Sequence, residues 1–235
     1  MGYEQTSNKQ QFNPSAVGGQ RLYIYADIAN LKSEPTNVGY WHTAIKTIYT
    51  RCPDLVKDWK NLKPMIDELE NLAGTCAHKG RMETVGYIMQ SLGLTIRLKN
   101  FSLEAREHAK RLEQDSLAYY LSPQDVNRIA AYFCREARFG ISGPKTGGHV
   151  QAVENFIRLE SAIRLWLSNG RIDKAQATLH YLVLHVHDYS TDPQMSKHAK
   201  TPEFQVVVDD LHLLNAIIAL EQMPANLDPM WIYLN

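Results

Sequence analysis

Apolar residues recur three or four positions apart along almost the whole chain, and this spacing limits the fold more than any other feature. An α-helix has about 3.6 residues per turn, so such a series places its apolar side chains on one face. The clearest series follows a capping serine and a first-turn proline, and it comprises Val126, Ala130, Phe133 and Ala137. The chain is therefore expected to be all-α, a multi-helix bundle of αα-hairpins in one or two lobes with extended terminal arms.

Similar series predict the other helices. In the second half of the chain, one follows His149, another covers 175–186, and a third begins at Thr201-Pro202-Glu203 and stops before Pro224. A cap, a proline and a first-turn acid mark that last start. In the first half, helices are expected at about 38–51, 54–73, 79–92 and 102–120.

Two short stretches, RLYIYADIA at 21–29 and LTIRLK at 94–99, are rich in β-favouring residues. They are candidate strands. Two such pieces cannot build a doubly wound sheet, so the sequence predicts at most a minor β element.

One short pattern occurs twice. Gly80-Arg81-Met82-Glu83 and Gly170-Arg171-Ile172-Asp173 both read glycine, arginine, apolar, acid. The glycine would close one helix and the acid would lie in the first turn of the next. The pattern resembles the inter-helix turn of tetratricopeptide and pentatricopeptide repeats. The copies are 90 residues apart, which is no multiple of the tetratricopeptide period of about 34 residues, so we expect local hairpins instead of a solenoid.

These features divide the chain into five predicted parts. The division is a polar N-terminal arm at 1–20, an N-terminal helical lobe at 21–140, a Gly-rich connection at 141–148, a C-terminal helical lobe at 149–222 and an apolar tail at 223–235. In the tail, Trp231, Ile232 and Tyr233 are predicted to dock on a partner chain.

Composition is that of an ordinary globular protein, with 44% hydrophobic and 21% charged residues. No stretch approaches 18 consecutive apolar residues and the N-terminus is polar, so we expect neither a membrane span nor a signal peptide. The three cysteines form no CxxC pair and predict buried thiols in a reducing compartment. The expected location is cytoplasmic, with no cofactor.

Charge is balanced overall but unevenly placed. Residues 1–200 contain all 25 Lys and Arg with 20 acids, whereas residues 201–235 contain five acids and no Lys or Arg. A basic body with an acidic end could bind a polyanion, or it could stack head to tail with copies of itself.

The stretch FGISGPKTGG at 139–148 has three interpretations. It is not a phosphate-binding P-loop, because Lys145-Thr146 follows proline and the preceding segment is helical. The residues Phe139 to Ser142, followed by Lys145-Thr146-Gly147, resemble the helix-turn-helix of insertion-sequence transposases, which would imply a turn at Gly140 and DNA contacts from Lys145. The third interpretation is a Gly-rich connection between two helices.

Basic residues near this stretch and in 79–111 are candidate contacts for a nucleic-acid backbone, with aromatic residues close by. The candidates are Arg135, Arg138, Lys145, Lys79, Arg81, Arg106, Lys110 and Arg111. The alternative is a solvated helix face.

A metal centre is the competing hypothesis. Adjacent His187-Asp188 resembles the paired ligands of all-helical HD-type phosphohydrolases, which implies an upstream histidine and a downstream aspartate, here His149 and either Asp209 or Asp210. The glycine and lysine that usually follow the pair are absent.

The sequence thus favours a non-enzymatic α-helical assembly protein. Its expected partners are other protein chains, above all copies of itself, with RNA or single-stranded DNA as a further partner. An HD-type hydrolase and a helix-turn-helix DNA-binding protein remain the alternatives.

Overall fold

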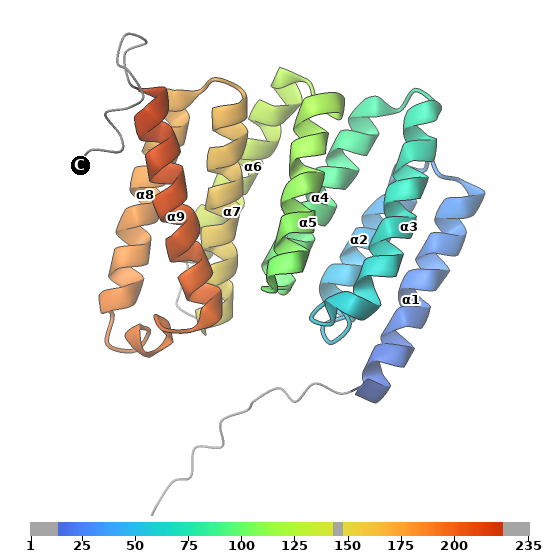
Figure 1. Cartoon of the computed structure of the whole chain (residues 1–235), viewed down its shortest axis with the longest axis horizontal. Coiled ribbons are helices and arrows are strands. Elements are labelled where there is room, and N and C mark those ends of the chain that lie inside the picture. Colours follow the sequence, from blue (N-terminus) through green and yellow to red (C-terminus); the bar gives the residue numbers. More distant parts are fainter. Residues whose placement is uncertain (1–13, 143–147, 223–235) are drawn as a thin grey trace, which may run out of the picture. The chain divides into compact units, whose positions relative to one another are not determined.

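The computed structural model describes residues 14–142 and 148–222, and within them the chain forms nine α-helices and no strand. The predicted all-α fold is confirmed. The chain separates into two compact units, Met1–Glu113 and Gln114–Asn235. In each unit, successive helices run up and down as hairpins (Figure 1).

The first unit contains five helices. These are α1 (Pro14–Ser33), α2 (Val38–Arg51), α3 (Trp59–His78), α4 (Met82–Lys99) and α5 (Leu103–Asp115). Helix α1 packs against α2 and α3, and α4 packs against α2 and α3. The core between them consists of fully buried apolar side chains, among them Ile24, Leu31, Trp41, Ile48, Leu62, Ile66, Leu92 and Ile96.

The second unit is centred on one helix. It contains a π-helical turn (Ser116–Tyr120), α6 (Pro123–Ser142), α7 (Gly148–Ser168), α8 (Ile172–Thr191), a 3₁₀ turn (Ser196–His198) and α9 (Pro202–Glu221). Helix α7 contacts α6, α8 and α9, so it is buried on most of its circumference. Its core residues include Phe156, Leu159, Ile163 and Trp166.

Side-chain caps fix several of the helix starts. The Asn37 side chain accepts the backbone N–H of Gly39, and the Thr201 hydroxyl accepts that of Phe204 at the start of α9. Asp58 accepts the N–H of Asn61 and so delays the start of α3 to Trp59, five residues after the predicted start at 54.

Both candidate strands are wrong, because 21–29 lies in α1 and 94–99 lies in α4. In α1, Ile24, Ile28 and Leu31 are buried at steps of four and three, the spacing of a helix face. Burial of this face outweighs the β-preference of the individual residues, since propensity is the weaker influence.

The two glycine–arginine turns have the same backbone geometry. Gly80 has φ 76° and Gly170 has φ 65°, left-handed values that favour glycine. In each turn the glycine N–H donates to the backbone carbonyl three positions earlier. The arginine N–H donates to the carbonyl five positions earlier, which is that of Cys76 in the first turn and of Trp166 in the second. This is a Schellman motif, and it confirms the two predicted hairpins.

The thiols match their prediction in part. Cys52 and Cys76 are buried, and burial raises the pKa of Cys52 to about 11. Cys134 is half-buried, with its sulfur 3.9 Å from the Thr178 hydroxyl. Among the described residues, no helix is long and apolar enough to cross a membrane.

Helices α4 and α5 approach each other closely at Gly93. A Cβ on Gly93 would lie 2.9 Å from the Ala109 carbonyl oxygen and 2.9 Å from Cγ of Glu113. Glu113 is held by a buried ion pair with Arg97 at 3.3 Å, and the Ala109 oxygen is part of the helix backbone. Neither of these two groups therefore has room to move away. Glycine is required here for close packing.

We predict that Gly93→Ala lowers the free energy of unfolding by about 1–3 kcal/mol, because the methyl group overpacks this contact. Gly74→Ala in α3 is the control. No heavy atom lies within 4 Å of its Cβ position, so the same change should stabilise the protein by about 0.5–1 kcal/mol through helix propensity. Urea denaturation measures both, and equal effects of the two substitutions would refute the packing role.

Candidate functional site

Helix α1 carries a second apolar face in addition to the one that packs in its unit. Leu22 is 69% exposed, Tyr23 51% and Tyr25 42%. The small residues Ala26 and Ala29 are exposed on the same side, one and two turns further along. We call these residues the α1 face. A helix that is apolar on two sides normally has a partner on each.

Helix α9 has the same property. Phe204, Val207, Leu214 and Ile218 are its buried apolar residues, in the unit where it packs on α7 and α8. Its outer side presents Leu213 and Leu220, 47% and 49% exposed, with the exposed Ala216 and the half-buried Ile217 between them. Positions 213, 216, 217 and 220 form one stripe at helical spacing, which we call the α9 face.

The two faces differ in charge. Within its bounds α9 contains four acidic residues and no Lys or Arg, whereas α1 contains two basic residues and one acidic residue. Beside the α9 face, Asn215 lines a shallow pocket of about 590 Å³ together with Val183 and His180 of α8. Helix α1 thus has a net charge of +1 and α9 of −4, but Lys32 of α1 is paired with Glu68 and Asp210 of α9 is buried beside Arg164.

Two of the five predicted phosphate contacts in the first unit form ion pairs with glutamates. Lys110 donates to Glu107 at 3.2 Å and Arg111 to Glu70 at 2.9 Å, while Arg106 is half-buried. Lys79 and Arg81 are exposed at the turn between α3 and α4. Among the five candidates in this unit, these two residues have the most solvent-accessible positive charges.

In the second unit, Arg135 lies on the outer side of α6 with its side chain 62% exposed and its Nε 3.7 Å from the Glu136 carboxylate. Its guanidinium lies 5.4 Å from the ring centre of Tyr132, which is 49% exposed. The Arg138 side chain, Lys145 and the tail residues Trp231, Ile232 and Tyr233 lie outside what the structure describes.

The helix-turn-helix resemblance implies a turn at Gly140, and this placement is wrong. Gly140 to Ser142 form the last residues of α6, and α7 begins at Gly148 with φ 62°. The helix continues because Ala137 is still buried against the unit's core. The segment 143–147 lies outside the described residues.

The four residues of the HD-type hypothesis are not brought together as a ligand group. His149 is engaged on both nitrogens: Nδ1 forms a hydrogen bond with the Tyr189 hydroxyl, and Nε2 lies 3.1 Å from the Thr201 hydroxyl. His187 and Asp188 are exposed on α8, and Asp209 is exposed on α9 and accepts from Gln205 at 3.2 Å. His149 thus connects three segments of the second unit and stabilises their packing.

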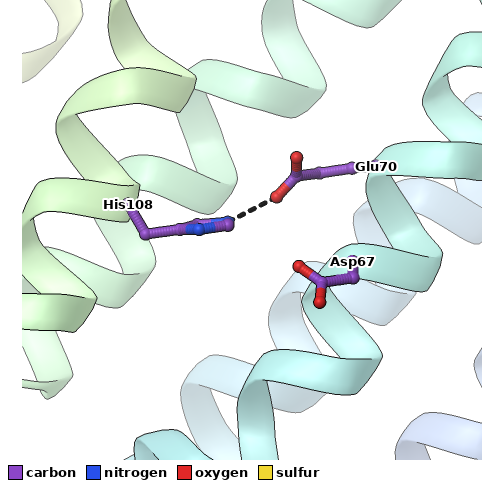
Figure 2. A group of neighbouring side chains, drawn as sticks. All are labelled: Asp67, Glu70 and His108. Atoms are coloured by element: carbon purple, nitrogen blue, oxygen red, sulfur yellow. Dashed lines mark hydrogen bonds and ion pairs between the residues drawn. The ribbon is translucent and has the colours of Figure 1, made fainter.

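Among the described residues, one group of side chains meets the spacing of metal ligands. It consists of Asp67 and Glu70 on α3 and His108 on α5, whose donor atoms all lie within 4.8 Å of one another (Figure 2). Sequence reasoning missed it, because His108 is 38 residues from Glu70. The spacing of Asp67 and Glu70 by three positions was the available signal for a shared helix face.

The environment of His149 makes the second unit sensitive to pH. Burial lowers the pKa of His149 below 6.5, and the His198 ring stacked on it at 4.6 Å lowers the pKa further. The unfolded chain therefore binds this proton more readily than the folded one, so stability falls as the pH drops below about 6.5.

We predict that the unfolding free energy of the native sequence decreases between pH 7 and pH 5, and that His149→Gln has a shallower decrease. Glutamine keeps polar groups near Tyr189 and Thr201 but cannot titrate. Urea denaturation at the two pH values checks this prediction, with the exposed His187→Gln as control. Identical pH profiles for His149→Gln and the native sequence would contradict it.

Comparison with known proteins gives no relative: no protein-family model, no curated protein and no solved structure matches this chain.

Proposed function

We propose that this protein is a non-enzymatic assembly subunit, in which the α1 face of one copy binds the α9 face of the next. The observation that carries the proposal is the exposed apolar stripe on each of these helices. Helical proteins that remain single normally end in helices with polar outer faces. Here the first and last described helices both have apolar ones.

The charges favour α1 against α9 over α9 against α9. The acids of α9 have no Lys or Arg on the same helix, and α1 supplies Arg21, whereas Lys32 of α1 is already paired with Glu68. A contact between two α9 faces would bring the acidic residues of both copies together, which is unfavourable. A contact between unlike faces leaves one free face at each end, so further copies can add and build open chains unless the two ends meet and close the assembly.

The contact is expected to be weak and reversible. Two helix faces of about 20 residues bury less than the roughly 1,200 Å² of a stable interface. Chain length should therefore depend on protein concentration.

We predict that Leu22→Glu on α1 and Leu220→Glu on α9 each reduce the native mass to that of a single 26.8 kDa chain, because a charge in the apolar contact loses its hydration. Mixing the two variants should restore association, since each retains the face that the other lacks. Light scattering after size exclusion measures both results.

Leu103→Glu is the matched control for that experiment. Leu103 is 77% exposed at the start of α5, a helix that contributes to neither face, so its replacement should leave the native mass unchanged. Association of the Leu22→Glu variant alone would show that like faces pair and would refute the proposed order. A single-chain mass for the native protein at every concentration would refute the assembly itself.

Contact with single-stranded nucleic acid is a second candidate function, favoured by the Tyr132 and Arg135 pair on α6. An exposed aromatic ring with a guanidinium beside it can stack a base and contact its phosphate. On α6, Arg128 also carries an exposed charge, but it donates to Asp125 at 2.6 Å.

We predict that Tyr132→Ala with Arg135→Ala weakens binding of a labelled single-stranded oligonucleotide. The slope of log affinity against log salt should also fall by about 0.7 for each phosphate that the protein no longer neutralises. Arg128→Ala removes one charge from the same helix and serves as control. A slope that the double substitution leaves unchanged would exclude α6 as the binding surface.

A further inference from the structure

The cluster of Asp67, Glu70 and His108 is independent of the assembly faces, and it belongs to the first unit alone. We propose that it binds a divalent transition metal ion of the Zn²⁺ class. One imidazole nitrogen and two carboxylate oxygens are donors that such ions accept, with further positions left to water. Mg²⁺ and Ca²⁺ prefer oxygen donors only, so they should bind poorly.

The two helices orient the donors toward one another. Asp67 and Glu70 lie three positions apart on α3, and the His108 ring projects from α5 to meet Glu70 (Figure 2). The His108 side chain is only 9% exposed. Its ring packs edge-to-face with Trp59, with 5.1 Å between the ring centres, and this packing limits rotation of the imidazole. The imidazole is thus the fixed ligand of the site.

Glu70 divides its two oxygens between two neighbours. Oε2 accepts from Arg111 at 2.9 Å, and Oε1 faces His108 Nε2. The Arg111 guanidinium also lies 3.4 Å from His108 Nε2, so an ion inserted between Oε1 and Nε2 must displace it from the ring while its bond to Oε2 remains. Arg111 then acts as an outer partner that orients a ligating carboxylate, as such partners do in established metal sites.

Asp67 is the adjustable ligand. In a tetrahedral Zn²⁺ site the donor atoms lie about 3.4 Å from one another. The donor atoms of this cluster lie within 4.8 Å of one another, so they must move closer together to bind the ion. The Asp67 side chain is 44% exposed, so it can rotate toward the ion and leaves a path for the ion to enter from solvent.

Lys63 competes with the ion for Asp67. Its ammonium donates to both carboxylate oxygens, at 3.0 and 2.7 Å, and is itself 40% exposed. Exposed ion pairs of this kind are weak, so an arriving ion can displace it. Removal of Lys63 should therefore strengthen metal binding, which is a result that a purely structural ion-pair network does not predict.

The test is a titration of the full-length protein with Zn²⁺ by calorimetry, and with Co²⁺ by tryptophan fluorescence. Co²⁺ bound at His108 lies close enough to Trp59 to quench its emission, and a Trp59→Phe variant identifies that part of the signal. We expect one Zn²⁺ per chain at this site, quenching by Co²⁺, and no competition from equimolar Mg²⁺.

Three variants locate the ion. His108→Ala and Glu70→Gln should each weaken binding by about tenfold or more, and Lys63→Ala should strengthen it by about two- to fivefold, the equivalent of one exposed ion pair. His187→Ala, an exposed histidine on α8, is the control and should have no effect. Circular dichroism confirms that each variant is folded.

The proposal is overturned if the native protein binds no Zn²⁺, or if His108→Ala, while folded, binds it as tightly as the native protein. Quenching by Co²⁺ that persists in Trp59→Phe would place the ion elsewhere. A Lys63→Ala variant that binds no more tightly would remove Asp67 from the ligand set.

Discussion

Burial of apolar helix faces is the interaction on which the rest of this structure depends. In the first unit, Ile24, Trp41 and Leu62 come from three different helices and are all fully or almost fully buried. The hydrophobic contribution of burying one such side chain is about 1.5–3 kcal/mol. Tight turns make this packing possible, because the left-handed Gly80 and Gly170 reverse the chain while backbone N–H groups of each turn donate to carbonyls at the helix end.

The same physics explains the proposed activity. Helices α1 and α9 bury one apolar face within their units and leave a second one in solvent. Exposed apolar stripes are costly in water and typically mark sites of protein contact. In the proposed contact, the acids of α9 disfavour pairing of α9 with itself. Nucleic-acid contact through Tyr132 and Arg135 would be an additional property of each subunit.

The helical fold could be predicted because its determinants are local. A capping residue such as Thr201 and an apolar step of three or four are readable without knowledge of any distant residue. The errors arose where local signals conflicted. Tyr23, Ile24 and Tyr25 favour strands individually, but burial of Ile24 with Ile28 and Leu31 decides for a helix. At α3, the Asp58 cap set the start and the apolar pattern alone did not.

Site residues were harder to predict because they depend on partners distant in sequence. Arg111 is basic in any interpretation of the sequence, but only the structure pairs it with Glu70, 41 residues away. His149 matches a metal-ligand pattern, yet Tyr189 and Thr201 occupy its nitrogens. The group formed by α3 and α5 was invisible for the same reason, since its histidine and carboxylates come from separate helices.

Sedimentation velocity of the unmodified protein over a wide concentration range tests the central claim most directly. Subunits joined through unlike faces should give sedimentation coefficients that rise continuously with concentration, because each added copy presents a new free face. A single boundary at the 26.8 kDa chain mass throughout, or a plateau at twice that mass, would contradict the account.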